Sequence, residues 1–172
     1  WSVDDFNYKK DTWSDGQTSY FLKDDTLFSS TKHGVNNPIS SSVVDFTKTK
    51  DILVYWKTDN RLVVQKGSGE KQEYVTDEPV WTSIVVDDQV FIVSKSVKTN
   101  KVKISKVNET ITPYTEFLAR SYETIHSMGI FSLNKDQYVL HLEIGMKEGG
   151  SRKKSLRTAV LSKTNPSDYK LS

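Results

Sequence analysis

Short apolar runs alternate with polar turns along most of this chain. The clearest examples are residues 38–46 followed by 51–66, and residues 79–87 followed by 88–95. These runs are rich in Val, Ile, Tyr, Phe and Trp, which favours strands over helices. Each example has the same order of a strand, a turn and a strand hairpin. A period near 40 residues that is built only from strands is typical of stacked β-units such as propeller blades.

Two weaker copies of this pattern flank the clear ones. A hairpin is predicted at residues 18–30 around the polar turn 23–26, without a clear leading strand. The later copy is stretched: strands are predicted at 125–133 and 137–144, and a basic loop at 149–154 precedes a closing strand at 156–161. Asp and Asn in the segments between strands suit tight turns, because these residues tolerate left-handed backbone angles.

The fold predicted from this pattern is all-β and antiparallel, and resembles a β-propeller with about four repeated units. The physical basis is that one such sheet cannot bury both of its faces alone, so neighbouring sheets must stack on it. A β-sandwich or a barrel is the alternative, because it produces similar alternation and turn spacing. Residues 1–172 are interpreted as a single all-β domain or as a fragment of a larger propeller, since the chain starts at Trp1 in the middle of a unit.

One segment fits two readings. Leu118, Tyr122 and Ile125 follow a helical spacing, and Pro113 suits a first helical turn. The repeat instead places residues 116–121 where an outer strand lies in the preceding copy, at 72–75. We favour the strand.

Composition adds exclusions to this picture. The net charge of +2, from 24 basic and 22 acidic residues, gives no support for binding nucleic acid. No apolar run approaches the ~18 residues of a membrane span. The absence of cysteine excludes disulfides and thiolate metal sites. The sequon Asn108-Glu109-Thr110 favours an extracellular or secreted setting, in which glycosylation of Asn108 would be sterically possible.

Candidates for catalysis are few, so whether the chain is an enzyme is uncertain and a non-enzymatic role is favoured. Asp45, Asp87 and Glu143 lie beside apolar runs and would provide carboxylates for glycoside hydrolysis if they met in a cleft. Asp45 and Asp87 also end their runs just before turns, where Asp commonly bonds its own backbone. His141 shares a strand face with Glu143, but no third ligand joins them. We therefore assign no catalytic residue, metal site or cofactor.

Aromatic residues favour recognition instead. Trp56 and Trp81 occupy matching neighbourhoods of adjacent copies, with Arg61 and Glu78 close in sequence, and these four are the candidate binding residues. The competing interpretation is that Trp in a strand belongs to the core. We predict a non-enzymatic binding module that recognises a protein or glycan partner through an aromatic-containing loop or cleft. The alternatives are a carbohydrate-active enzyme of the glycoside hydrolase-like propeller type, or a fragment of one, and a partial propeller that a companion chain completes.

Overall fold

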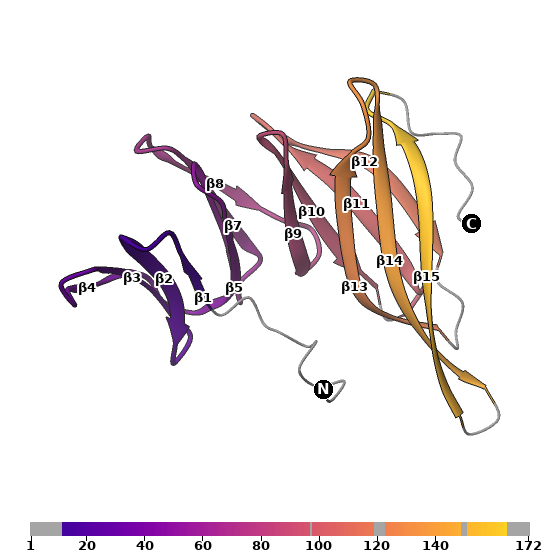
Figure 1. Ribbon diagram of the computed structural model, residues 1–172, viewed down its shortest axis with the longest axis horizontal. Coiled ribbons are helices and arrows are strands. Elements are labelled where there is room, and N and C mark those ends of the chain that lie inside the picture. The colour runs from indigo at the N-terminus through magenta and orange to yellow at the C-terminus, as the bar shows by residue number, and fades with distance from the viewer. Residues whose placement is uncertain (1–11, 97, 119–122, 149–150, 165–172) are drawn as a thin grey trace. The chain divides into compact units, whose positions relative to one another are not determined.

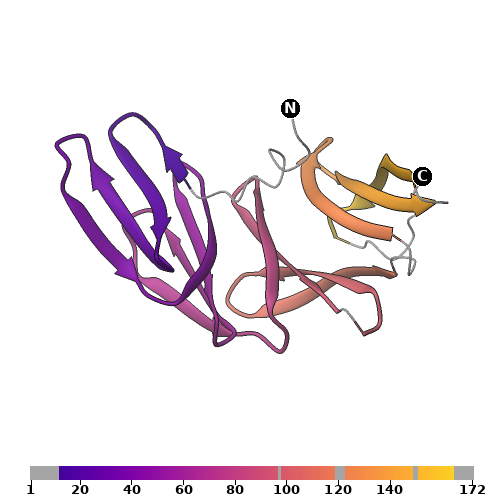
Figure 2. The same ribbon diagram turned by 90° about the horizontal axis from the view of Figure 1, so that it is seen from below.

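The computed structural model describes residues 12–96, 98–118, 123–148 and 151–164. Within these ranges every regular element is a β-strand, and the fifteen strands form four antiparallel sheets. Each sheet is built from strands that follow one another along the chain, so each occupies one continuous stretch of colour in Figures 1 and 2. No helix in the described ranges is long and apolar enough to cross a membrane.

The chain divides into two compact units, residues 1–83 and 84–172, and the boundary falls within β9. Unit 1 holds sheets A and B. Sheet A has the strand order β1 (Thr12–Ser14), β2 (Thr18–Lys23), β3 (Thr26–Thr31) and β4 (Asn36–Ser40). Sheet B has the order β5 (Val43–Lys48), β6 (Ile52–Lys57), β7 (Arg61–Lys66) and β8 (Lys71–Val75).

Sheets C and D follow. Sheet C has the order β12 (Ile111–Leu118), β11 (Lys101–Val107), β10 (Gln89–Lys95) and β9 (Val80–Val86). Sheet D has only three strands, in the order β13 (Glu123–Ser132), β14 (Gln137–Glu148) and β15 (Ser151–Ser162). The segment that fitted both a helix and a strand is therefore extended where it is described, in β12 and β13, and residues 119–122 lie outside the described ranges.

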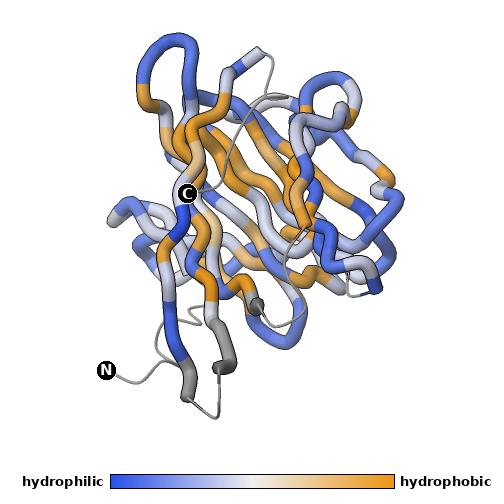
Figure 3. The backbone as a smooth tube through the Cα atoms, turned by 90° about the vertical axis from the view of Figure 1, so that its right-hand side faces the viewer, coloured by the Kyte–Doolittle hydropathy of each residue, from blue (hydrophilic) through white to orange (hydrophobic). Residues whose placement is uncertain are grey.

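Turn residues set where these strands end. Asp24 and Asp25 have φ of 51° and 61°, and Asp87 and Asp88 have φ of 48° and 63°. Two consecutive residues with positive φ between paired strands are the signature of a type I′ hairpin turn, whose twist matches that of the strands. Figure 3 shows the result along the backbone, with hydrophobic positions in the strands and hydrophilic positions in the turns.

One predicted run is divided by such a residue. Residues 38–46 were expected to form the leading strand of the second copy, but Pro38 lies in β4 of sheet A, and β5 of sheet B starts at Val43. Ser42 separates the two strands because its φ of 56° is incompatible with an extended strand. The first sheet thus gains a fourth strand that the sequence pattern did not reveal.

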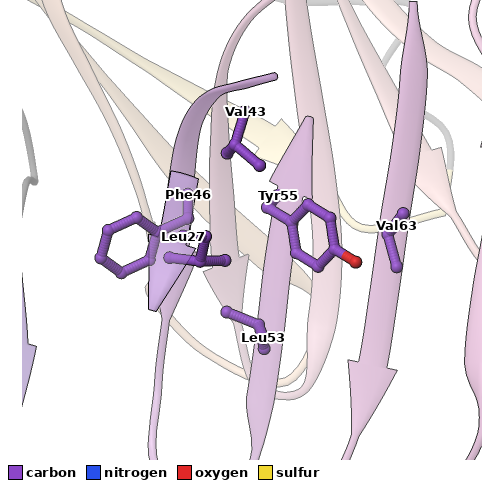
Figure 4. Packing of buried hydrophobic residues seen from close by; sticks show 6 residues of the cluster. All are labelled: Leu27, Val43, Phe46, Leu53, Tyr55 and Val63. Atoms are coloured by element: carbon purple, nitrogen blue, oxygen red, sulfur yellow. The ribbon is translucent and has the colours of Figure 1, made fainter. Parts of the chain in front are cut away.

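The core of unit 1 lies between sheets A and B. Leu27 of β3 meets five residues of sheet B in one cluster, and Figure 4 shows the six side chains, Leu27, Val43, Phe46, Leu53, Tyr55 and Val63. The strand β6 of sheet B is buried on both faces, because every residue from Ile52 to Trp56 is buried although successive side chains point to opposite faces. A strand of that kind reads as a continuous apolar run rather than as an alternating one.

In unit 2, an aromatic cluster joins sheets C and D. The ring of Phe91 on β10 lies 5.5 Å from the rings of both Tyr114 on β12 and Tyr138 on β14, measured between centroids. The Tyr114 hydroxyl donates a hydrogen bond to the carbonyl of Ser162 at the end of β15. Rings at these separations stabilise a contact beyond the area that they bury.

Candidate interaction surface

The two faces of sheet D differ in how they are covered. β14 is the central strand and pairs with β13 on one side and β15 on the other. On the inner face, Ile130, Leu140 and Ala159 lie opposite one another across the three strands, and all three are buried. Because successive side chains of a strand point to opposite faces, the residues next to these three must point outward.

The outward-pointing residues form cross-strand rows. Phe131, Val139 and Val160 make one row, directly beside the buried row. Leu133 directly follows β13, and its N–H donates a hydrogen bond to the Gln137 carbonyl at the start of β14. The alternation of β13 therefore extends to Leu133, which points outward like Phe131. Further along β14, His141 and then Leu156 of β15 extend the same surface. We call the set Phe131, Leu133, Val139, His141, Leu156 and Val160 the sheet D outer face.

This face is exposed although it is apolar. Phe131 is 57% exposed, Leu133 55%, Leu156 65% and Val160 47%. These four are half of the eight large hydrophobic residues that are exposed in the described part of the chain. Single exposed hydrophobic residues are normal, but a group on one continuous surface marks an interaction site.

Aromatic packing fixes the side chains at the centre of the face. The ring of Phe131 lies over Gly129, where an added Cβ would come within 3.0 Å of the ring. The imidazole of His141 meets the Phe131 ring edge to face, with the centroids 5.2 Å apart and the planes at 76°. Gly129 therefore leaves the space that the phenyl ring fills, and the ring and the imidazole hold each other in place.

Polar groups border the face and have partners of their own. The carboxylate of Glu143 accepts a hydrogen bond of 3.2 Å from the Ser127 hydroxyl and forms an ion pair of 3.3 Å with Lys154. Because this carboxylate is already hydrogen-bonded and neutralised, a hydrophobic partner could cover the face without burying an uncompensated charge. An apolar centre with a satisfied polar rim is the usual anatomy of a protein interface.

A second group of polar side chains in unit 2 surrounds the Phe91, Tyr114 and Tyr138 rings. Lys163 places its ammonium 4.8 Å from the centre of the Tyr138 ring and forms a 3.5 Å ion pair with Asp87. Lys106 lies 4.7 Å above the Tyr114 ring and donates to the Lys163 carbonyl at 2.7 Å. Burial raises the pKa of Tyr114 to about 12 and lowers that of Lys106. These contacts tie sheet C to sheet D, so we interpret the group as structural.

The four binding residues predicted from the sequence occupy different environments. Trp56 is only 3% exposed and lies in the core of sheet B, and its buried indole N–H has no hydrogen-bond partner among the described residues. Arg61 is exposed and pairs with Asp59 of the β6–β7 turn at 3.2 Å and with Glu73 of β8 at 3.5 Å. Glu78 and Trp81 are half-buried. The binding role of these four residues stays a prediction.

The carboxylates considered for glycoside hydrolysis lie on different elements, Asp45 on β5, Asp87 in the β9–β10 turn and Glu143 on β14. Asp87 lies in the β9–β10 turn, beside Lys163 and the inward-facing Tyr138. Glu143 points outward, and five residues of β14, about 17 Å, separate it from Tyr138. Asp45 accepts a hydrogen bond of 2.8 Å from the N–H of Phe46 in unit 1. No cluster of three potential metal ligands occurs among the described residues.

Sequence reasoning missed the sheet D outer face, although a signal for it exists. Val139 stands between Tyr138 and Leu140, and Val160 stands between Ala159 and Leu161, so both faces of these strands carry apolar residues. A strand with one wet face would alternate. The continuous run therefore indicates a strand with two apolar faces, and exposure of one of them follows only from the three-dimensional structure.

Comparison with solved structures supports the fold. The N-terminal domain of Nup159 matches with a TM-score of 0.53 and 12% sequence identity, over 94% of this chain and 47% of the Nup159 chain. The four consecutive antiparallel sheets together with this likeness show an all-β, β-propeller-like fold, as the sequence pattern predicted. The chain spans about half the length of the Nup159 chain that it matches.

Two further structures are more distant. One is an S. cerevisiae assembly of Dbp5 bound to Nup159, Gle1, IP6 and ADP, with a TM-score of 0.47, 11% identity, and coverage of 94% of this chain and 58% of the matched one. The other is PorZ, a surface component of the type-IX secretion system of Porphyromonas gingivalis. It matches with a TM-score of 0.42 and 15% identity, over 83% of this chain and 20% of the PorZ chain. These scores are too low to inform the fold or the function. No protein-family model matches the sequence, and no curated protein does.

Proposed function

We propose that this protein is a non-enzymatic module that binds a protein partner through the sheet D outer face. The observation that carries the proposal is the group of exposed hydrophobic residues on one rigid sheet, with Phe131 and His141 packed together at its centre. Burying a few large apolar side chains supplies most of the free energy of many protein interfaces.

The chemistry of this surface favours a protein over a glycan. A sugar site needs several converging hydrogen-bonding groups beside its aromatic platform. The sheet D outer face instead presents Leu133, Leu156 and Val160, and the carboxylate of Glu143, on the same side of the sheet, is already engaged by Ser127 and Lys154. Aliphatic groups of this kind suit apolar side chains of another polypeptide.

An extracellular or secreted setting remains part of the proposal. Asn108 is exposed between β11 and β12, where an attached glycan would have access to solvent. Expression in a secreting eukaryotic host, followed by enzymatic removal of N-glycans, tests this point. A mass change that disappears in Asn108→Gln supports modification of this residue, and an unmodified chain contradicts it.

The binding proposal is tested by quantitative affinity capture from a lysate of the source organism. The test protein carries Phe131→Ser, Leu156→Ser and Val160→Ser, and the matched control carries Val35→Ser, Val44→Ser and Val75→Ser, three exposed hydrophobic residues of unit 1. We expect the test variant to lose at least about ten-fold of the specifically captured protein, because removal of interface hot spots costs more than ~1.4 kcal/mol. The control should retain it.

Equal capture by wild type and test variant would contradict this assignment of the surface. Circular dichroism of both variants checks that the β-structure is preserved. Since all six substituted side chains are at least 47% exposed, little packing within the chain is lost.

A further inference from the structure

Three strands of unit 1 bring two aromatic rings and one ammonium group together. Trp13 of β1 and Tyr20 of β2 lie opposite each other on paired strands, and their rings meet edge to face with centroids 5.9 Å apart and planes at 61°. The ammonium of Lys48, the last residue of β5, lies 4.4 Å from the centre of the Trp13 ring and 5.2 Å from that of the Tyr20 ring. We call Trp13 and Tyr20 the aromatic cage, since their rings face one cation from two sides.

Oxygen atoms surround the same cation. The Lys48 ammonium donates hydrogen bonds to the carbonyls of Thr49 and Lys50, the second at 3.2 Å. The carboxylates of Asp15 and Asp51 attract its charge. Ring faces, carbonyl oxygens and carboxylates all present negative electrostatic potential, so this combination is the chemistry of a site for an organic cation.

The walls of the cage do not depend on the Lys48 side chain. Trp13 and Tyr20 pack against the buried core cluster of unit 1. The Asp15 carboxylate accepts two hydrogen bonds of 2.8 Å from backbone N–H groups that follow it, which fix it in the β1–β2 turn. Lys48 and both rings are half-buried and Asp15 is exposed, so solvent reaches the site. A ligand that displaces the Lys48 ammonium therefore meets a preformed site, which lowers the cost of binding.

Lys48 is not the best occupant for this cage. Burial lowers the pKa of Lys48, and the attraction of Asp15 and Asp51 offsets only part of this effect. The reason is that a primary ammonium is strongly hydrated and loses water when the rings cover it. A quaternary ammonium is more weakly hydrated and keeps its attraction to the ring faces. Its methyl groups also form weak hydrogen bonds with carbonyl oxygens such as those beside Lys48.

We propose that the aromatic cage binds a quaternary ammonium group, and that the ammonium of Lys48 occupies the cage until such a ligand displaces it. The cage belongs to unit 1 and the sheet D outer face to unit 2, so this binding is additional to the proposed function.

The ligand that fits this chemistry is a trimethylated lysine of another polypeptide. A choline headgroup carries a phosphate beside its ammonium, and the carboxylates of Asp15 and Asp51 repel a second negative charge. A trimethylated lysine has no phosphate. Its stem is also the same four-carbon chain with which Lys48 reaches the two rings.

Calorimetric titration of the whole chain with a short peptide that contains one trimethyllysine tests this site. Wild type should bind the peptide about ten-fold more weakly than Lys48→Ala, because the internal competitor leaves the cage free for only a fraction of the time. In the Lys48→Ala background, Trp13→Phe should weaken binding about two- to five-fold, since tryptophan attracts a cation more strongly than phenylalanine does. If Lys48→Ala loses its β-sheet circular dichroism spectrum, Lys48→Gln replaces it.

Lys71→Ala is the matched control. The ammonium of Lys71 also lies near a ring of unit 1, but at 5.9 Å from Tyr55 alone, so this variant should bind the peptide like wild type. The same peptide with unmodified lysine should bind more weakly than the trimethylated one, and so should phosphocholine. The indole N–H resonance of Trp13, which is identified by its loss in Trp13→Phe, reports in parallel whether the ligand reaches the cage.

Three results would overturn the proposal. The first is a Lys48→Ala variant that binds the peptide no more tightly than wild type. The second is a Trp13 resonance of wild type that does not move at a peptide concentration that saturates Lys48→Ala, since Lys48 would then not be displaced. The third is equal or tighter binding of unmodified peptide or phosphocholine. The Phe131→Ser, Leu156→Ser, Val160→Ser variant should bind the peptide like wild type, so a failure of the proposed function leaves this result unchanged.

Discussion

Tyr114 shows how a single side chain joins two sheets. Its ring packs on Phe91 of the same sheet and on Tyr138 of sheet D, and its hydroxyl donates to the Ser162 carbonyl. Burial and the neighbouring Tyr138 raise its pKa from 10.0 to about 12. The neutral phenol is therefore the form that the folded protein favours.

Alkaline pH should remove the stability that the neutral side chain of Tyr114 contributes. The unfolded chain releases the Tyr114 proton near pH 10, whereas the folded protein retains it until about pH 12, so stability is complete below pH 10 and falls as pH rises through 12. Tyr114→Phe should cost about 1 kcal/mol at pH 8. The difference in free energy of unfolding between wild type and Tyr114→Phe should shrink towards pH 12. Urea unfolding measures it, with Tyr20→Phe as a control.

The lowered pKa of Lys106 acts in the opposite direction, because the unfolded chain binds the proton of this lysine more tightly. Since Lys106 is present in wild type and in Tyr114→Phe, it affects both proteins alike. A difference between the two that stays constant from pH 8 to 12 would contradict the role given to Tyr114.

Within one sheet, the strand β13 shows how an irregularity is accommodated. Its pairing with β14 shifts between Ile125 and Ser127, so His126 occupies a bulge. A Cβ added at Gly145 on β14 would lie 2.2 Å from Nε2 of His126. Glycine at this position therefore leaves room for the imidazole of the bulged residue.

A double-mutant cycle tests this fit. Gly145→Ala alone should leave the free energy of unfolding unchanged or lower it, because the imidazole must move. In a His126→Ala background, the same change should raise it by about 0.5 to 1 kcal/mol, since alanine has less conformational freedom to lose than glycine. Equal effects in both backgrounds, measured by urea unfolding, would show that the two residues do not interact.

At the scale of the whole molecule, hydrophobic burial is divided between two compact units. Phe46 is 1% exposed in the core of unit 1, and Leu140 is fully buried in unit 2. The sequence predicts one domain for residues 1–172. A single domain of this size would unfold in one cooperative transition that responds to a cavity anywhere in its core.

Calorimetry of two core variants tests that prediction. Phe46→Ala and Leu140→Ala should each destabilise the protein by about 2 to 5 kcal/mol. If the chain is one domain, each variant should lower the midpoint of the same single transition. Two transitions, of which each variant shifts only one, would show that units 1 and 2 unfold independently.

Much of the fold follows from local chemistry. Alternation and β-branched residues predicted the strands, and Asp and Asn placed turns at residues 24–25 and 58–60, because strand period and positive φ depend on only a few neighbouring residues. The repeat predicted four units and a propeller-like fold. The same local rules failed at Ser42, where a residue that is not specific for positive φ separates two sheets.

The candidate site depends on contacts that local patterns do not contain. Trp56 and Phe131 both belong to apolar strands, yet Trp56 is 3% exposed and Phe131 is 57% exposed. The difference arises from which sheet covers which face, and that depends on residues far apart in sequence. Hydrophobicity along the chain therefore determined that the sheets exist and have apolar faces, whereas only their packing in three dimensions decided which of these faces is left for a partner.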